Sequence, residues 1–148
     1  MALIPRNKLL PGWFHCINRG VNRQRIFLDT DDYQRFTKSL IYHAKEHEVD
    51  LGAFCLMPNH WHIVMCFSKI ENMSSLFRIL LNGHTKYHHQ KYQTIGHGPI
   101  YQGRFKSIRI ENDRDLLRIA EYVELNPVRG NLVKSAKDWR WCSATWGQ

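Results

Sequence analysis

The chain has 148 residues, a length typical of one domain, and 43% of them are apolar, enough to bury a sizeable core. Lys and Arg number 21 against 13 Asp and Glu, so the formal net charge of +8 favours a polyanionic partner. The first residues lack the apolar segment of a signal peptide, and no apolar run is long enough to span a bilayer, which disfavours a secreted or membrane protein. We therefore expect one cytoplasmic domain over residues 1–148.

Cysteine spacing gives no sign of a zinc knuckle or a thioredoxin-type site, because no two cysteines stand in a CxxC pair. Reduced cysteines in the core of a cytosolic protein are the simplest interpretation. The four are Cys16, Cys55, Cys66 and Cys142.

The first half of the chain predicts three strands and a helix. Residues 13–20 (WFHCINRG) predict a strand that ends in a basic turn. Residues 29–49 begin with acidic side chains, which suit a helix amino terminus, and their apolar residues recur at helical spacing. Residues 51–57 and 60–67 predict two strands joined by Pro58-Asn59, a tight-turn signal.

The second half predicts two helices around one strand. Residues 72–92 and 112–126 have helical periodicity, with Pro127 ending the second helix, and residues 101–110 (YQGRFKSIRI) predict a strand. The order is therefore β-α-β-β-α-β-α. Its first six elements match an α+β, ferredoxin-like plan, in which an antiparallel sheet carries two crossover helices on one face. The last helix is an addition to that plan.

The register of the central hairpin places its two histidines on one sheet face. With Pro58-Asn59 as a two-residue turn, Met57 faces His60 and Cys55 faces His62. The opposite face is the more apolar and is expected to pack against the crossover helices. It holds Phe54, Leu56, Trp61, Ile63, Met65 and Phe67. The histidines are then left on the face where the extra helix can lie.

His60 and His62 can chelate one metal ion, because side chains at i and i+2 of a strand run parallel. The alternative is a pair of hydrogen-bonded histidines in a sheet, which is the commoner situation for an arbitrary HxH sequence. Two other HxH chemistries fail: a metallohydrolase of the HxHxDH type needs Asp where Val64 stands, and a paired-HxT/S phosphoesterase needs Thr or Ser at His62.

The third predicted helix carries a polar stripe beside its apolar one. The apolar stripe consists of Leu116, Ile119, Ala120 and Val123. Arg118, Tyr122 and Asn126 form the second stripe and could reach one site. Asn offers an oxygen ligand, Tyr a nucleophile and Arg a phosphate contact. The alternative is a Tyr at the core edge and an Asn that only hydrogen-bonds the helix end.

Four motifs in order resemble the single-tyrosine HUH transposases, and in particular the REP-associated tyrosine transposases. They are NRGVNRQRIF, MPNHWH, YQGRFKSIRI and AEYVELNPVRG, and the resemblance extends from about His15 to Cys142. The family fold is the same ferredoxin-like sheet with a tyrosine-bearing helix. Two departures are the bulky Trp61 between the histidines and the tail DWRWCSATW, which matches the family's Trp-Ser-Ser ending only loosely.

The resemblance implies a role for each motif residue. His60 and His62 become metal ligands, Asn126 takes the third-ligand position, and Tyr122 becomes the nucleophile that forms a 5′-phosphotyrosine. The expected cofactor is a divalent metal ion, Mg²⁺ or Mn²⁺. The expected substrate is single-stranded or hairpin DNA, such as REP-like palindromes. A monomer or a homodimer is expected, in a nucleoid-associated location in the bacterial cytoplasm.

Two basic clusters are candidates for DNA contact, although a solvated basic face is the alternative for each. One follows the first strand, and the other, His84 to Lys91 with Tyr87 and Tyr92, could track a DNA backbone while its tyrosines stack on bases. The candidate residues are Arg19, Arg23, Arg25, Lys86, Arg104, Lys106 and Arg118. The i,i+4 histidine pairs His43/His47 and His84/His88 are interpreted as surface histidines, because no third ligand stands near either.

The expected function is a metal-dependent single-strand DNA endonuclease and strand-transferase. A rival of another class is a catalytically silent DNA-binding regulator on the same fold, which explains the charge but not the set His60, His62, Tyr122 and Asn126. A second rival is a replication initiator or relaxase, which the lone tyrosine in this helix disfavours.

Overall fold

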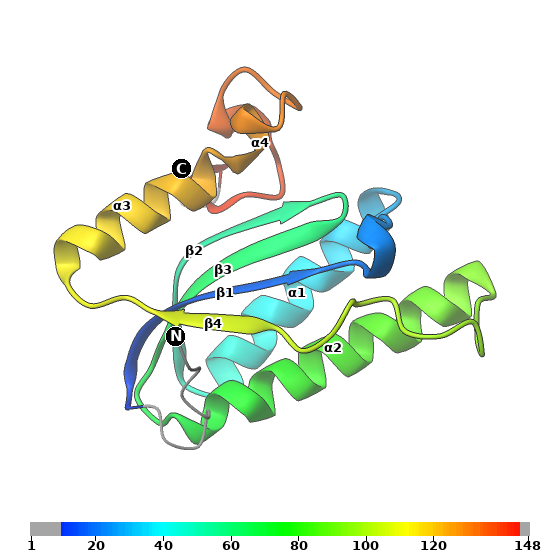
Figure 1. Ribbon diagram of the computed structural model, residues 1–148, viewed down its shortest axis with the longest axis horizontal. Helices are drawn as coiled ribbons and strands as arrows, with labels where there is room; N and C mark the ends of the chain where they lie inside the picture. The colour runs from blue at the N-terminus through cyan, green and yellow to red at the C-terminus, as the bar shows by residue number, and fades with distance from the viewer. Residues whose placement is uncertain (1–9, 146–148) are drawn as a thin grey trace.

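The computed structural model describes residues 10–145 and contains one four-stranded sheet in the order β2-β3-β1-β4, with every neighbouring pair antiparallel (Figure 1). The strands are β1 (Gly12–Arg19), β2 (Val49–Met57), β3 (His60–Phe67) and β4 (Lys106–Arg109). This strand order and the alternation with helices confirm the predicted α+β, ferredoxin-like plan.

Helices cover both faces of the sheet. The long helices α1 (Thr30–Glu46) and α2 (Glu71–Tyr92) lie on one face, and α3 (Asp113–Glu124) with the short α4 (Asn126–Arg129) lies on the other, beside β2 (Figure 1). The described residues also include three 3-10 helices: η2 (Val21–Arg23), η3 (Ala136–Asp138) and η4 (Ser143–Thr145). Within residues 10–145, no helix combines the length and the apolar character that crossing a membrane requires.

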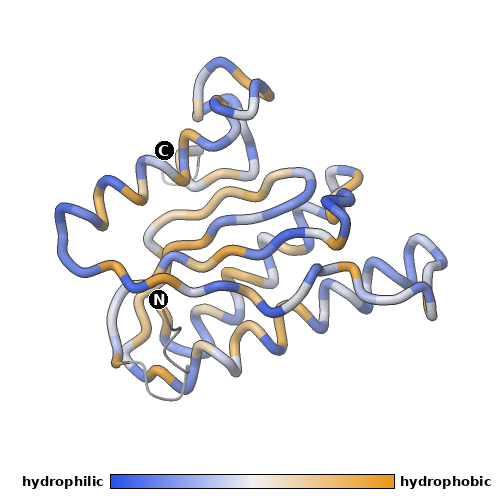
Figure 2. The backbone as a smooth tube through the Cα atoms, viewed as in Figure 1, coloured by the Kyte–Doolittle hydropathy of each residue, from blue (hydrophilic) through white to orange (hydrophobic). Residues whose placement is uncertain are grey.

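The larger core lies between the sheet and the helices α1 and α2. Every residue that the hairpin register assigned to this face belongs to it, including Trp61, whose ring stacks on Phe77 with centroids 5.6 Å apart. In Figure 2 the two hairpin strands are largely hydrophobic, whereas the turn that joins them is hydrophilic. The period-2 pattern therefore identified the buried face correctly.

A chain of hydrogen bonds crosses this core. Trp61 Nε1 donates to the Tyr101 hydroxyl (3.0 Å), which lies 2.6 Å from His84 Nδ1. His84 Nε2 lies 3.0 Å from the Ile26 carbonyl oxygen, which can only accept, so Nε2 carries the proton and Nδ1 accepts from Tyr101. The prediction that His84 and His88 are surface histidines is wrong, because they are only 2% and 8% exposed.

Strand β4 is shorter than the predicted strand over residues 101–110. Only Lys106–Arg109 pairs with β1, and Tyr101 makes an isolated bridge with Gly20. Between them the Asn18 side chain donates to the Gly103 carbonyl oxygen at 3.1 Å, which takes the place of a backbone partner. The Tyr101 ring itself belongs to the larger core.

The smaller core lies between α3 and the histidine face. The predicted stripe Leu116, Ile119, Ala120 and Val123 packs there against Ala53, Cys55 and Val64. Helix α3 ends at Glu124 rather than at residue 126. Pro127 has no N–H to donate to Val123, so the chain turns and begins α4 at Asn126.

The carboxy-terminal segment covers the outer edge of the sheet, which the sequence did not predict. Leu56 N donates to the Trp141 carbonyl oxygen (2.9 Å), and Trp139 Nε1 donates to the Leu56 carbonyl oxygen (2.9 Å). The backbones of Cys142 and Cys55 form an isolated antiparallel β-bridge. These contacts occupy backbone groups that edge strand β2 would otherwise expose. Cys16, Cys55 and Cys142 are buried thiols, as predicted, whereas Cys66 is partly exposed.

Candidate active site

The two histidines of β3 lie on the sheet face opposite α1 and α2, as predicted. Met57 pairs with His60 and Cys55 with His62, which is the register that a two-residue turn requires. Their ring centroids are 5.1 Å apart. His62 is 8% exposed, and His60 is half-buried at the end of the strand. The hairpin alone therefore brings both imidazoles to one place.

Asparagine side chains bind both nitrogens of the His60 ring. Asn126 Nδ2 lies 3.3 Å from His60 Nε2, and Asn59 Oδ1 lies 2.7 Å from His60 Nδ1. Because an amide nitrogen only donates, Nε2 must accept, so Nδ1 carries the proton and donates to Asn59. This tautomer keeps the Nε2 lone pair directed toward Asn126 on α4.

A third histidine, which the sequence analysis did not select, supports His62. His15 Nε2 lies 2.9 Å from His62 Nδ1, and the rings are stacked with centroids 5.1 Å apart. His15 belongs to β1 and stands opposite Val64, so His62 is its diagonal neighbour across the strand pair. The alternation along β1 could have placed His15 on this face, but its contact with His62 depends on the β1–β3 register.

The three imidazoles are held neutral. Burial lowers the pKa of His62 to about 3, with further lowering by His15, His60 and Arg129, and burial lowers the pKa of His15 to about 4. The pKa of His60 is also lowered, first by burial and then by the nearby charge of Arg19. A neutral imidazole keeps one lone pair, which is the form that binds a metal ion.

Tyr122 lies beside the histidines and faces solvent. Its ring centroid is 6.3 Å from that of His62, and the residue is 51% exposed, so a large substrate can reach it. Arg129 Cζ lies 3.7 Å from the centroid of the Tyr122 ring. By contrast Tyr101, the other tyrosine in a family motif, is buried among hydrogen-bond partners and cannot reach the histidine face.

The donor set suits a divalent cation. His60 Nε2 and the His62 ring offer nitrogens, and rotation of the Asn126 amide would present Oδ1 where Nδ2 now faces His60. In the described part of the chain, no group of three or more His, Cys, Asp or Glu residues could hold a metal ion. A metal at this position would therefore need the Asn126 amide or a substrate oxygen as a ligand.

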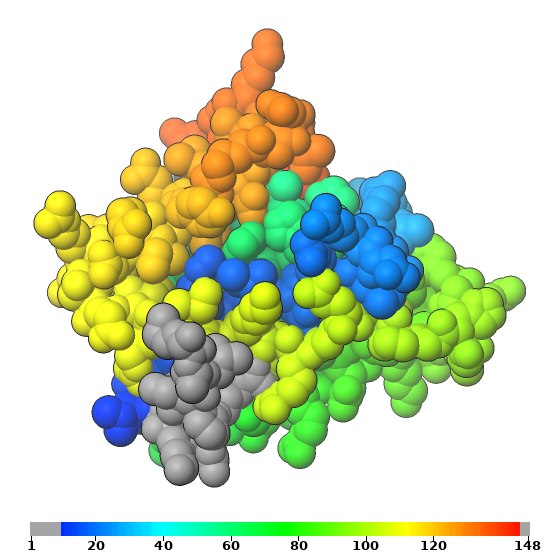
Figure 3. All heavy atoms as spheres, in the orientation of Figure 1, coloured from blue at the N-terminus to red at the C-terminus, as the bar shows by residue number. Residues whose placement is uncertain are grey.

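A cationic cleft of about 440 Å³ opens next to His60. Its lining residues are Ile17, Asn18, Arg19, Arg23, Asn59, His60, Gln102, Arg104 and Lys106. Arg19 pairs directly opposite His60 in the sheet and donates to Gln102 Oε1 through Nε (3.2 Å) and a terminal nitrogen (3.1 Å). In Figure 3 the atoms of the segment after β1 (blue) lie next to those of the segment before β4 (yellow-green).

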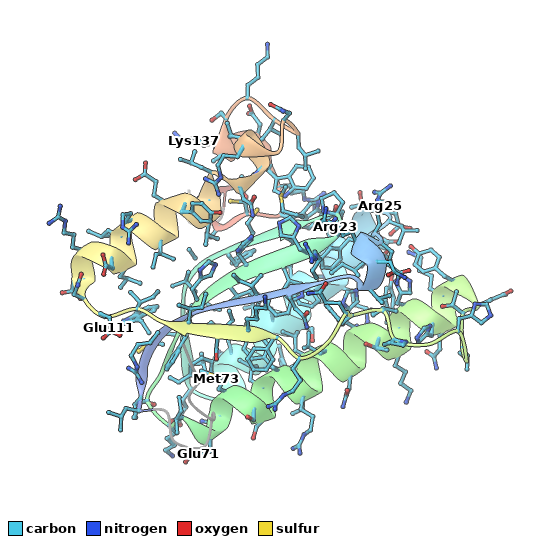
Figure 4. All side chains as sticks on the ribbon, viewed as in Figure 1. Arg23, Arg25, Glu71, Met73, Glu111 and Lys137 are labelled. Carbon is cyan, nitrogen blue, oxygen red and sulfur yellow. The ribbon has the colours of Figure 1, made fainter. Side chains whose placement is uncertain are left out.

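Four of the seven predicted DNA contacts, Arg19, Arg23, Arg104 and Lys106, therefore converge on this cleft. Arg25 follows Arg23 in the same loop but does not line the cleft (Figure 4). Arg118 is exposed on α3, where its guanidinium lies 3.4 Å from Asp115. Lys86 is exposed on α2, in the layer on the other side of the sheet from the histidines.

The His84–Lys91 segment, predicted to track a DNA backbone, lies in the α1/α2 layer and not beside the histidines, and several of its polar groups bind within that layer. Lys91 Nζ donates to Asp32 Oδ1 (2.8 Å) and to Asp29 Oδ2 (2.7 Å). The hydroxyls of Tyr87 and Tyr92 also donate to Asp32. These bonds tie the end of α2 to the start of α1, because Asp32 is buried and needs partners for its charge.

Comparison with known proteins finds transposases similar to this chain. The sequence model of the family described as "Transposase IS200 like" matches residues 11–126. A REP-associated tyrosine transposase of Escherichia coli K12 is 26% identical over 128 residues, which cover 86% of this chain and 72% of the relative. A putative REP-associated tyrosine transposase of Haemophilus influenzae is 25% identical over 122 residues, covering 77% and 69%.

Two solved structures share the fold. One is a REP-associated tyrosine transposase bound to a REP hairpin, with a TM-score of 0.74, 24% identity, and coverage of 97% of this chain and 82% of that chain. The other is a putative transposase from Deinococcus radiodurans, with a TM-score of 0.55, 14% identity, and coverage of 83% and 96%. The family match spans both β3 histidines, Tyr122 and Asn126. The chain belongs to the IS200-like transposase family.

Proposed function

We propose that this protein is a metal-dependent single-strand DNA endonuclease and strand-transferase that acts on hairpin DNA, as in transposition. The observation that carries the proposal is a set of side chains beside a cleft lined by arginines: Asn126 of α4 contacts His60, Tyr122 of α3 lies next to His62, and the two histidines are neighbours on β3. A silent DNA-binding protein would need the cleft but not an exposed tyrosine next to two neutral imidazoles.

The cleft residues would bind and orient the DNA strand. Arg19 and Arg104 carry guanidiniums that can form paired hydrogen bonds with phosphate oxygens, and Lys106 adds a third positive charge. Arg19 stands across from His60, so a strand bound there would have a phosphodiester next to the histidines. A divalent cation, when bound by His60, His62 and Asn126, would neutralise phosphate charge and polarise the phosphorus–oxygen bond.

Tyr122 would act as the nucleophile. Its hydroxyl oxygen forms a bond to phosphorus while the bond from phosphorus to the 3′ oxygen of the preceding nucleotide breaks. The phenol gives up its proton and the departing oxygen gains one, so the products are a 5′-phosphotyrosine and a 3′-hydroxyl. The phosphoester bond is exchanged rather than hydrolysed, so a 3′-hydroxyl can attack the phosphotyrosine and rejoin the strand without ATP.

The test is formation of a covalent adduct. Purified protein is incubated with Mn²⁺ and a labelled hairpin that carries a single-stranded flank, and the products are resolved under denaturing conditions. We expect a protein–DNA adduct that does not form when a chelator is present from the start. DNA binding without adduct or cleavage under these conditions would favour the silent regulator.

The proposed function also implies a location in the bacterial cytoplasm with the nucleoid. Size-exclusion chromatography with and without DNA would distinguish a monomer from a homodimer.

A further inference from the structure

His15 is a buried polar residue of the histidine face that the proposed chemistry leaves without a role. It is 8% exposed, and its Nε2 lies 2.9 Å from His62 Nδ1. The register pairs His15 with Val64 and Ile17 with His62, so the two imidazoles meet on a diagonal and stack with an interplanar angle of 28°. The contact leaves Nε2 of His62 as the ring nitrogen not bound by His15.

The contact matters because a neutral imidazole has only one lone pair. His62 can coordinate a cation through Nε2 only when its proton is on Nδ1. An acceptor at Nδ1 selects that tautomer, and His15 Nε2 is placed to be the acceptor. If His15 Nε2 instead carried a proton, it would donate a hydrogen bond to an unprotonated His62 Nδ1. The proton of neutral His62 would then lie on Nε2, which could not bind a metal.

The neighbouring ligand has the same arrangement with a different partner. Asn59 Oδ1 lies 2.7 Å from His60 Nδ1, so each proposed ligand has a side-chain partner behind the nitrogen that does not face the metal position. An amide oxygen can only accept, whereas an imidazole can donate or accept. The orientation of His62 therefore depends on the tautomer of His15 in a way that the orientation of His60 does not depend on Asn59.

We propose that His15 is a positioning residue that holds His62 as the Nδ1–H tautomer, with Nε2 free for a divalent cation. This inference rests on the proposed metal-dependent function. The plain structural alternative is that the two buried imidazoles only satisfy each other, in which case any residue that packs equally well at position 15 leaves metal binding unchanged.

Two substitutions distinguish a positioning role for His15 from simple packing. His15→Gln keeps an acceptor oxygen on a side chain that can reach Nδ1, and His15→Phe keeps a planar ring without an acceptor. His97→Phe, in the exposed loop before β4, is the matched control. Each protein is measured without DNA, by long-range ¹H–¹⁵N NMR for the His62 tautomer and by calorimetric titration with Mn²⁺ for affinity. Thermal unfolding shows whether each variant is folded.

In the wild-type protein we expect His62 to be protonated on Nδ1. His15→Phe is expected to lose this preference and to bind Mn²⁺ about 10- to 100-fold more weakly, the usual effect of removing a residue that orients a metal ligand. His15→Gln is expected to bind within a few fold of wild type, and His97→Phe like wild type.

Three results would overturn the role of His15: a wild-type His62 protonated on Nε2, a folded His15→Phe variant with wild-type Mn²⁺ affinity, or a His15→Gln variant as weak as His15→Phe. Failure of the proposed function looks different. Wild-type protein that binds no Mn²⁺ and cleaves no DNA overturns the metal-dependent reaction itself, while the NMR measurement still decides whether His15 sets the His62 tautomer.

Discussion

The guanidinium of Arg129 lies over the ring of Tyr122, with Cζ 3.7 Å from the ring centroid, and also donates to the Tyr122 backbone carbonyl oxygen. Arg129 is the last residue of α4, and Tyr122 lies two residues before the end of α3. The contact therefore joins the two helices across Leu125, which lies between them, and restrains the Tyr122 ring that neighbours His62.

Loss of the contact between Arg129 and Tyr122 should slow cleavage modestly. An exposed cation–aromatic contact is worth about 0.5–1 kcal/mol, so Arg129→Gln should reduce the cleavage rate roughly two- to fivefold, through a smaller population of the held Tyr122 rotamer. Single-turnover cleavage of a flanked hairpin measures the effect. Arg35→Gln, which removes a similar stack on Tyr87 in the α1/α2 layer, is the control. Equal rates in both variants would show that Arg129 does not position Tyr122.

Tyr122→Phe should abolish cleavage and adduct formation while folding and DNA binding persist. The substitution removes the nucleophilic hydroxyl and little volume, and the side chain is half exposed, so no buried partner is left unsatisfied. Denaturing gels and a binding titration with the same hairpin measure the two properties. Tyr42→Phe, at another exposed tyrosine on α1, should retain full cleavage. Adduct formation by Tyr122→Phe would assign the nucleophile to another residue.

The Asn126 amide should contribute directly to metal affinity. Asn126→Ala removes the third proposed ligand beside His60, and we expect Mn²⁺ affinity to fall at least about tenfold, in the range seen when groups around a metal site are removed. Asn126→Asp should bind at least as tightly as wild type, because a carboxylate is a stronger ligand for a hard cation. Asn82→Ala on α2 serves as control. A wild-type affinity in Asn126→Ala would remove Asn126 from the site.

The cationic cleft should dominate the salt dependence of DNA binding. Each phosphate contact on a single strand contributes about 0.7 to the slope of log affinity against log salt, so Arg19→Gln and Arg104→Gln should each lower the slope by about that amount. Lys38→Gln, exposed on α1, should leave it unchanged, and Lys86→Gln tests the predicted contact in the α1/α2 layer.

In the same titrations a flanked hairpin should compete better than a blunt duplex, because tyrosine attack needs an unpaired phosphodiester. Equal competition would point to a general duplex binder.

His84 should make folding sensitive to acid. Burial lowers its pKa from 6.5 to about 4, although its bond to Ile26 acts in the opposite direction. Between pH 6.5 and about pH 4, the unfolded chain binds a proton at His84 and the folded chain does not, so the free energy of unfolding falls as pH falls. The contribution is roughly 3 kcal/mol at about 1.4 kcal/mol per pKa unit.

Chemical denaturation of wild type and His84→Gln at pH 7 and pH 4.5 measures this term. The variant should be less stable at pH 7, because it disturbs the bonds to Tyr101 and Ile26, but it should lose less stability on acidification. An unchanged difference between the two proteins at both pH values would show that His84 does not titrate in this way.

Local patterns in the sequence were sufficient to predict the sheet, its buried face and the packing of α3 on the histidine face. The turn at Pro58-Asn59 sets the hairpin register without reference to the rest of the chain, so the shared face of His60 and His62 follows from two adjacent strands. The stripe from Leu116 to Val123 likewise follows from helical periodicity. Both depend only on residues close together in sequence.

The remaining features depend on contacts between distant segments. His15 and His62 are 47 positions apart, and whether they meet depends on the β1–β3 register, which no turn between those strands determines. His84 is buried because Tyr101 and Ile26 from two other segments supply its hydrogen bonds, whereas its own helix would equally allow an exposed histidine. A polar residue is stable in the core only when hydrogen-bond partners surround it. Tertiary packing brings those partners together, so residue spacing along the chain does not predict them.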